Sequence, residues 1–172
     1  MLGVFSAGSL AYLGLGPFRS RLAAMERVRQ ILADGRTARI GLRATSDQIA
    51  EAERTLGLRL PISFREFLST WGQIEFGSTR VLGITAATDA ARSTDAGFVA
   101  ATIEARRTLG LSPHFILCVT HPNNLHVCLD TFSMRNEEAP AVLWNSSVRV
   151  VTLTLAPTFA DFLRDQLEAA IK

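Results

Sequence analysis

Two cysteines and two histidines gather in one short stretch of the chain: Cys118, His121, His126 and Cys128. Thiolate sulfur and neutral imidazole nitrogen are the usual ligands of tetrahedral zinc. If the stretch folds into a hairpin that is symmetric about Asn123, Cys118 lies opposite Cys128 and shares a face with His126. However, the closely spaced cysteine pairs of structural zinc sites are missing. We favour two buried thiols that pack as small apolar side chains, with a zinc site or a cross-strand disulfide as alternatives.

Other catalytic chemistry finds no support in the sequence. It contains no G-x-S-x-G, no P-loop, no G-x-G-x-x-G and no H-E-x-x-H motif. The adjacent carboxylates Glu137 and Glu138 precede Pro140 and are typical of a solvated turn. The sequence therefore predicts no catalytic residue, no metal ligand and no cofactor, and an enzyme or metal protein that uses the cysteine and histidine hairpin is the weakest alternative.

The composition indicates one folded domain. The chain has 172 residues, of which 48% are hydrophobic and only two are cysteines. This length is sufficient for a core without disulfides, and so few cysteines favour a reducing compartment, which we take to be the cytoplasm. The charge is uneven. Residues 1–43 carry seven arginines and two acidic residues, a net +5, whereas residues 44–172 carry 11 basic and 14 acidic residues, a net −3. No nucleic-acid partner is expected from the small total charge.

The uneven charge suggests two parts, an apolar and then arginine-rich helical extension over 1–43 and a compact domain over 44–172. The first eighteen residues carry no charge, and basic residues follow them, unlike the order of a signal peptide. Residues 1–24 pack on the domain, touch a membrane weakly, or are an artefact of an upstream start with Met25 as the real one. The run is short and rich in glycine, which makes membrane contact the least favoured of the three.

Helical periodicity and breakers divide the chain into elements. Helices are predicted over 19–34, over 46–56 with Thr45 and Gln48 as a capping box, over 64–71 with Ser63 as the cap, over 95–109, and from Thr158 onwards. Strands are predicted over 80–85, 114–121, 125–131, 141–145 and 148–155. Early helices, then mostly strands, then a last helix predict an α+β fold with a mostly antiparallel or mixed sheet and helices packed around it.

The order of several short motifs resembles the SUKH superfamily, the Smi/Knr-like domains. A helix ends at Leu56-Gly57 and Leu60-Pro61 follows. The next helix holds Phe67-Leu68 and ends at Gly72, Gly83 lies in a strand, and Phe162-Leu163 lies in the last helix. The resemblance covers residues 45–167. The turn at residues 122–124 departs from the acidic residue and glycine that the family often has there.

The resemblance implies a binding protein without catalysis. Many bacterial members are immunity proteins that bind and neutralise a cognate toxin, often a nuclease, and others are regulatory or scaffold modules, which is the alternative. A toxin that handles nucleic acid is basic, so exposed carboxylates would attract it. We expect the partner to contact four carboxylates and one indole: Glu75, Asp130, Glu137, Glu138 and Trp144. The indole has a second interpretation, namely packing in the core.

Overall fold

The computed structural model describes residues 16–33, 38–85, 97–121 and 123–172, and the side chains from Arg21 onwards within them. Its helices, in chain order, are α1 (Gly16–Leu32), α2 (Ser46–Leu56), α3 (Ile62–Thr70), α4 (Phe98–Thr108), the 3-10 helix η1 (Thr131–Ser133) and α5 (Phe159–Ala170). Its strands are β1 (Arg39–Ile40), β2 (Ile74–Phe76), β3 (Thr79–Val81), β4 (Phe115–Thr120), β5 (Leu125–Asp130), β6 (Ala141–Asn145) and β7 (Val150–Ala156). None of these helices is both long enough and apolar enough to span a bilayer.

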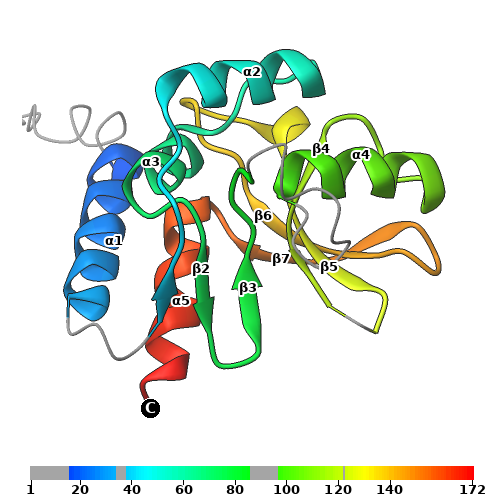
Figure 1. The fold of residues 1–172 in the computed structure, drawn as a ribbon. Coiled ribbons are helices and arrows are strands. Elements are labelled where there is room, and N and C mark those ends of the chain that lie inside the picture. Colours follow the sequence, from blue (N-terminus) through cyan, green and yellow to red (C-terminus); the bar gives the residue numbers. More distant parts are fainter. Residues whose placement is uncertain (1–15, 34–37, 86–96, 122) are drawn as a thin grey trace, which may run out of the picture.

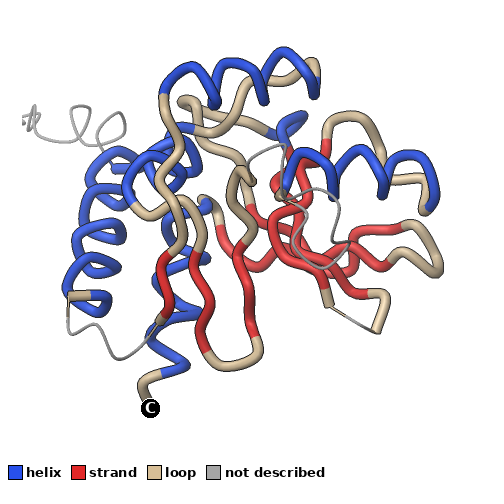
Figure 2. The backbone as a smooth tube through the Cα atoms, in the orientation of Figure 1, coloured by secondary structure: helices blue, strands red, loops and turns tan. Residues whose placement is uncertain are grey.

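The strands form two antiparallel sheets (Figure 2), which confirms the predicted α+β fold. The smaller sheet has the order β1-β2-β3 and the larger one the order β4-β5-β6-β7. Helix α4 packs on β4, and α5 packs on α1 and α3 (Figure 1). The two sheets meet where the N–H of Leu82, just after β3, donates to the carbonyl of Cys118 in β4.

An aromatic cluster joins the helices to one another. Phe64 of α3 stacks on Phe67, and its ring centroid lies 5.1 Å from that of Phe98 in α4 and 4.9 Å from that of Phe159 in α5. All four rings are fully buried. The spacing of Phe64, Phe67, Leu68 and Trp71 predicted one buried stripe, and the structure confirms that interpretation.

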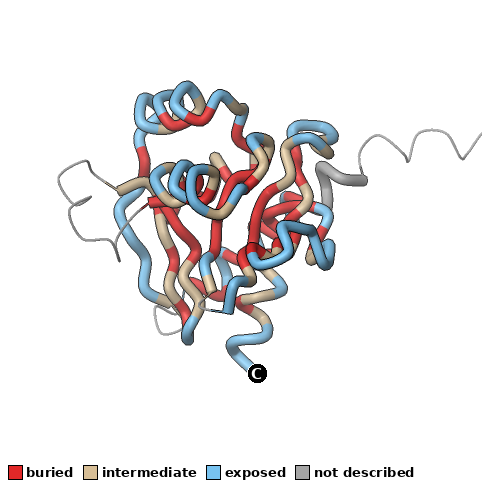
Figure 3. The backbone as a smooth tube through the Cα atoms, turned by 90° about the vertical axis from the view of Figure 1, so that its right-hand side faces the viewer, coloured by how far each residue is buried: buried red, intermediate tan, exposed pale blue. Residues whose placement is uncertain are grey.

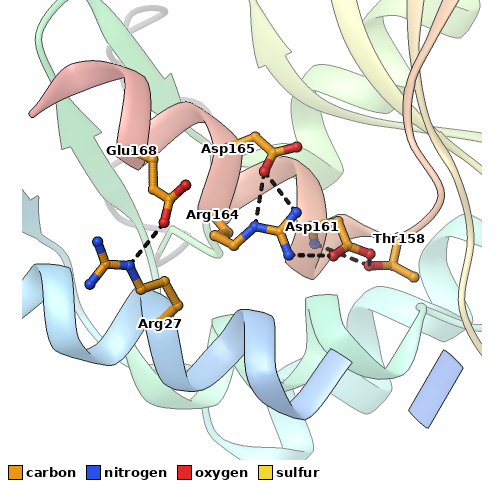
Figure 4. Close-up of polar contacts among 6 residues, drawn as sticks. All are labelled: Arg27, Thr158, Asp161, Arg164, Asp165 and Glu168. Carbon is orange, nitrogen blue, oxygen red and sulfur yellow. Dashed lines mark hydrogen bonds and ion pairs between the residues drawn. The ribbon is translucent and has the colours of Figure 1, made fainter. Parts of the chain in front are cut away.

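Helix α1 belongs to this same core. Met25 and Val28 are fully buried against the rest of the molecule, and Arg27 donates to Glu168 of α5 over 2.9 Å (Figure 4). The helical spacing of Leu22, Met25 and Val28 predicts one buried face, but Leu22 is 44% exposed. A division of the chain after residue 43 stays a prediction, and residues 1–15 lie outside the described ranges.

The two predicted helix caps have different outcomes. Thr45 accepts a hydrogen bond from the N–H of Gln48, and the Gln48 side chain accepts from the Thr45 N–H, which confirms the capping box of α2. Ser63 does not cap α3, because that helix begins one residue earlier, at Ile62. The Ile62 N–H donates instead to the carbonyl of Glu137, and Ser63 is buried.

Two further local predictions need correction. The strand predicted over 80–85 ends at Val81, because the backbone at Gly83 then runs against that of Gly72. The helical spacing over 95–109 predicts Ile103 on the inner face of α4, but Ile103 is 43% exposed, and the helix buries Thr102 and Ala105 instead. Figure 3 shows the buried parts of the chain gathered toward the middle of the molecule, with exposed stretches on the outer helices and at the C-terminus. The Thr102 hydroxyl accepts from the Leu117 N–H and so ties α4 to β4.

Candidate functional site

Two of the predicted contact carboxylates, Glu75 and Glu137, lie at the surface but are already paired. Glu75 is 3.3 Å from the Arg80 Nε and also accepts from the Gln73 side chain. Glu137 accepts from Arg65 over 3.3 Å. Their negative charge is therefore partly neutralised by arginines of the same chain, which weakens electrostatic attraction of a basic partner. As contact residues they stay predictions.

Asp130 is only partly exposed and has a local structural role. One oxygen accepts from the Phe132 N–H and the other from the Ser133 hydroxyl, at 3.1 Å and 2.7 Å. The carboxylate therefore caps η1 directly after β5. This arrangement holds the side chain against its own backbone.

Glu138 is buried, and the prediction that its carboxylate is exposed is wrong. Its side chain is 7% exposed, accepts a 2.6 Å hydrogen bond from the Ser63 hydroxyl and lies 3.7 Å from the Arg21 Nε. The residues that enclose it come from α1 and α3, far away in sequence, so the solvated-turn interpretation could not anticipate them. The carboxylate accepts from Ser63 in the first turn of α3, where the end of a helix favours a negative charge.

Burial raises the pKa of Glu138, although the Ser63 hydrogen bonds and the Arg21 charge lower it. An acid whose pKa is higher in the folded chain than in the unfolded chain stabilises the fold more as pH falls. Acidification from neutral pH through this pKa should therefore increase the free energy of unfolding of the wild type relative to Glu138→Gln, which does not titrate. Urea denaturation of both proteins at neutral and mildly acidic pH checks this. The prediction is wrong if the free energy of unfolding of the wild type minus that of Glu138→Gln stays constant or falls on acidification.

Trp144 lies in the core, as its second interpretation held, and not on the surface. It is 2% exposed, and its ring centroid is 5.8 Å from that of His126 on the neighbouring strand. Strand β6 has a neighbouring strand on each side, so the indole lies over the middle of the larger sheet and not at its edge. A partner that binds without unfolding the sheet cannot use Trp144 as an anchor.

The hairpin of β4 and β5 forms, but its register is not symmetric throughout. Thr120 pairs with His126 and Val119 with Val127, as symmetry about Asn123 requires, and the register then shifts so that Leu117 pairs with Cys128. Cys118 therefore does not lie opposite Cys128. The Cys118 thiol donates to the Val127 carbonyl over 3.3 Å.

Both cysteines are free and buried, and the predicted packing as small apolar side chains fits this. Burial raises the pKa of the Cys128 thiol to about 12. Burial, together with the nearby Cys128, raises the pKa of Cys118 well above its ordinary value. Both thiols are protonated at neutral pH and are poor nucleophiles and ligands. Among the described residues, no three histidine, cysteine or acidic side chains come together to hold a metal ion.

An apolar surface that sequence reasoning missed lies along β7 and the turn before it. Val148, Val150, Val151 and Leu153 are 62%, 50%, 41% and 55% exposed. Leu153 lies opposite Leu143 and Val151 opposite Trp144, so the two side chains point to opposite faces of the sheet. Apolar groups are thus exposed on both sides of one strand.

Strand β7 is also an edge. Within the described sheet it pairs only with β6, and no charged residue occurs between Val150 and Ala156. Natural edge strands usually carry a charge or a proline that discourages pairing with another chain. The uncharged run was visible in the sequence, but its place at the edge follows from the strand order, which the sequence alone did not give.

Comparison with known proteins agrees with this fold. The family model described as SMI1-KNR4 cell-wall, of the SUKH type, matches residues 25–168, and it therefore includes part of α1 as well as the stretch that carried the resemblance. A crystal structure of a protein from Pseudomonas syringae pv. tomato superposes with a TM-score of 0.63, at 20% identity, over 84% of this chain and 98% of that chain. No curated protein matches. The chain belongs to the SUKH family of SMI1-KNR4 domains.

Proposed function

We propose that this protein is a non-catalytic binding domain that acts in the cytoplasm as an immunity protein, by binding and neutralising a cognate toxin domain. Family membership supports a role in binding. The observation that carries the proposal is the exposed, uncharged edge strand β7, with Val150, Val151 and Leu153 open on both of its faces.

An edge strand suits a protein partner in particular. Its outward backbone N–H and C=O groups pair with an extended segment of another chain, and the apolar side chains on both faces are covered at the same time. The occupant we propose is an exposed strand of the toxin domain with apolar residues on both faces. The carboxylates Glu75 and Glu137 lie elsewhere in neutralising pairs, so apolar contact and strand pairing contribute most of the affinity.

The test is co-expression with the toxin-like reading frame next to the gene, followed by a binding measurement on the purified pair. Growth should be rescued, and Leu153→Lys should weaken binding at least tenfold, about 1.4 kcal/mol, because a charge at the edge opposes pairing. Ile171→Lys is the matched control, since Ile171 is 49% exposed directly after α5 and lies outside the strand.

The outcomes separate two claims. A toxin that binds neither variant nor wild type, with no rescue of growth, overturns the immunity role. A toxin that binds all three proteins equally well leaves the immunity role standing and overturns the assignment of β7 as the contact surface.

A further inference from the structure

The sequence of β7 is nearly symmetric about its central residue. It is V-V-T-L-T-L-A, with Leu153 in the middle. If two such strands pair antiparallel and are centred on Leu153, apolar residues lie opposite apolar residues and threonine lies opposite threonine. The opposed residues are Val150 and Ala156, Val151 and Leu155, Thr152 and Thr154, and Leu153 and its own copy. A contact between identical surfaces across a two-fold axis requires this kind of self-complementarity.

Charges do not oppose such a pairing. No charged residue occurs within β7, and Arg149 directly precedes the strand. In the antiparallel pair the two copies of Arg149 lie at opposite ends, about 26 Å apart along the strands at roughly 3.3 Å per residue. Salt screens like charges at that distance. Opposed apolar side chains and opposed threonines both stabilise a pair of strands.

The surface that such a contact covers is open in the single chain. Leu153 is 55% exposed and Val151 is 41% exposed, and Thr152 and Thr154 are exposed as well. Within the described sheet β7 pairs only with β6, so no described strand lies on its other side. The register shifts against β6 increase the twist of β7, and two paired strands tolerate more twist than a wide sheet. An open edge without charges favours pairing with another strand.

The opposite edge of the same sheet is not open in this way. The carbonyl of Cys118 in β4 accepts from the Leu82 N–H, and the Leu117 N–H donates to Thr102 of α4. Within the described part of the chain, the larger sheet therefore has one free edge, at β7. Pairing of this edge with its own copy closes after two chains and does not continue into a fibre.

We propose that two copies of this chain pair antiparallel through β7 when no other partner is bound, so that their larger sheets join into one continuous sheet. Leu153 lies on the two-fold axis and packs against its own copy. The dimer covers the apolar side chains that the single chain exposes on both faces of the strand. The second copy and the toxin exclude each other at this edge; that exclusion rests on the proposed function, whereas the dimer does not.

Analytical ultracentrifugation of the full chain tests the dimer without any toxin. The wild type should be dimeric at about 100 µM, a concentration that saturates contacts with a micromolar Kd. Leu153→Lys brings two positive charges together on the axis and should weaken dimerisation by about tenfold or more. Ile171→Lys adds the same charge outside the strand and should leave dimerisation unchanged. A wild type that is monomeric at this concentration overturns the dimer and leaves the immunity role untouched.

Cysteine cross-linking tests the register of the dimer. Leu153→Cys should form a disulfide with its own copy when oxidised glutathione is added, because residues on the axis lie directly opposite each other. Val151→Cys is the matched control on the same strand, since its two copies lie about 13 Å apart along the strands, beyond the reach of a disulfide. The native Cys118 and Cys128 are buried and do not compete.

Two results would overturn the assignment of the dimer to β7 in this register. One is a dimer that Leu153→Cys does not cross-link, and the other is a dimer that Val151→Cys cross-links as readily. Both residues are exposed, so the substitutions leave the core intact, and a circular dichroism spectrum equal to that of the wild type shows that each variant is folded.

Discussion

Replacing Phe64 with alanine should lower the free energy of unfolding by about 3–5 kcal/mol, the usual cost of removing a large buried ring. Phe64 is fully buried and touches rings from three helices: Phe67, Phe98 and Phe159. The cavity left behind would open at the point where α3, α4 and α5 meet, and rigid backbone on three sides limits its collapse. Urea denaturation followed by circular dichroism measures the loss.

The matched control is Phe132→Ala. Phe132 is 81% exposed in η1, and its removal should change the free energy of unfolding by no more than about 0.5 kcal/mol. A loss of less than about 1 kcal/mol for Phe64→Ala would show that the three-helix junction repacks freely, contrary to the structure described here.

Gly72→Ala should destabilise the fold by at least about 4 kcal/mol, since two separate costs add at this position. The backbone of Gly72 has φ +73°, where a side chain is disfavoured. A Cβ there would also lie 1.6 Å from the carbonyl oxygen of Leu42. That neighbour is backbone and cannot rotate away, so the segment that carries Leu42 would have to move.

Two other glycines separate the two costs. Gly57 has φ +67° but has nothing within 4 Å of a Cβ, so Gly57→Ala should cost only about 1 kcal/mol. Gly83 has no positive φ, yet its Cβ would lie 2.1 Å from the Gly72 carbonyl oxygen. Thermal unfolding of the three variants should therefore rank Gly57→Ala as the mildest. Equal losses at Gly57 and Gly72 would contradict the close backbone approach.

Predictions from the sequence were correct where the two interacting residues lie within a few positions of each other. Thr45 and Gln48 are three residues apart, and the predicted capping box is present. The buried stripe of α3 and the hairpin of β4 and β5 depend likewise on nearby residues. The structure explains why glycine occurs at two motif positions: without a Cβ, Gly72 and Gly83 allow backbone segments to touch.

Predictions failed where the deciding partner is distant. Ser63 is a residue type that often caps a helix, but its hydroxyl donates to Glu138, which lies 75 positions away in the sequence. The same contact buries Glu138, although its neighbours in the sequence predict a solvated turn. The shift of register at Cys118 arises where the Leu82 N–H binds that residue's carbonyl, a contact between two sheets. The exposure of β7 depends on the strand order.

The pairing of α1 with α5 has a consequence for synthesis of the protein on the ribosome. Arg27 and Glu168, which join these helices, are 141 positions apart, and the apolar side of α1 at Met25 and Val28 is covered only in the finished fold. A nascent chain therefore presents that side to its surroundings until α5 has emerged. Completion of the core thus waits for α5, and chaperones that recognise exposed apolar helices have time to bind before that helix is made.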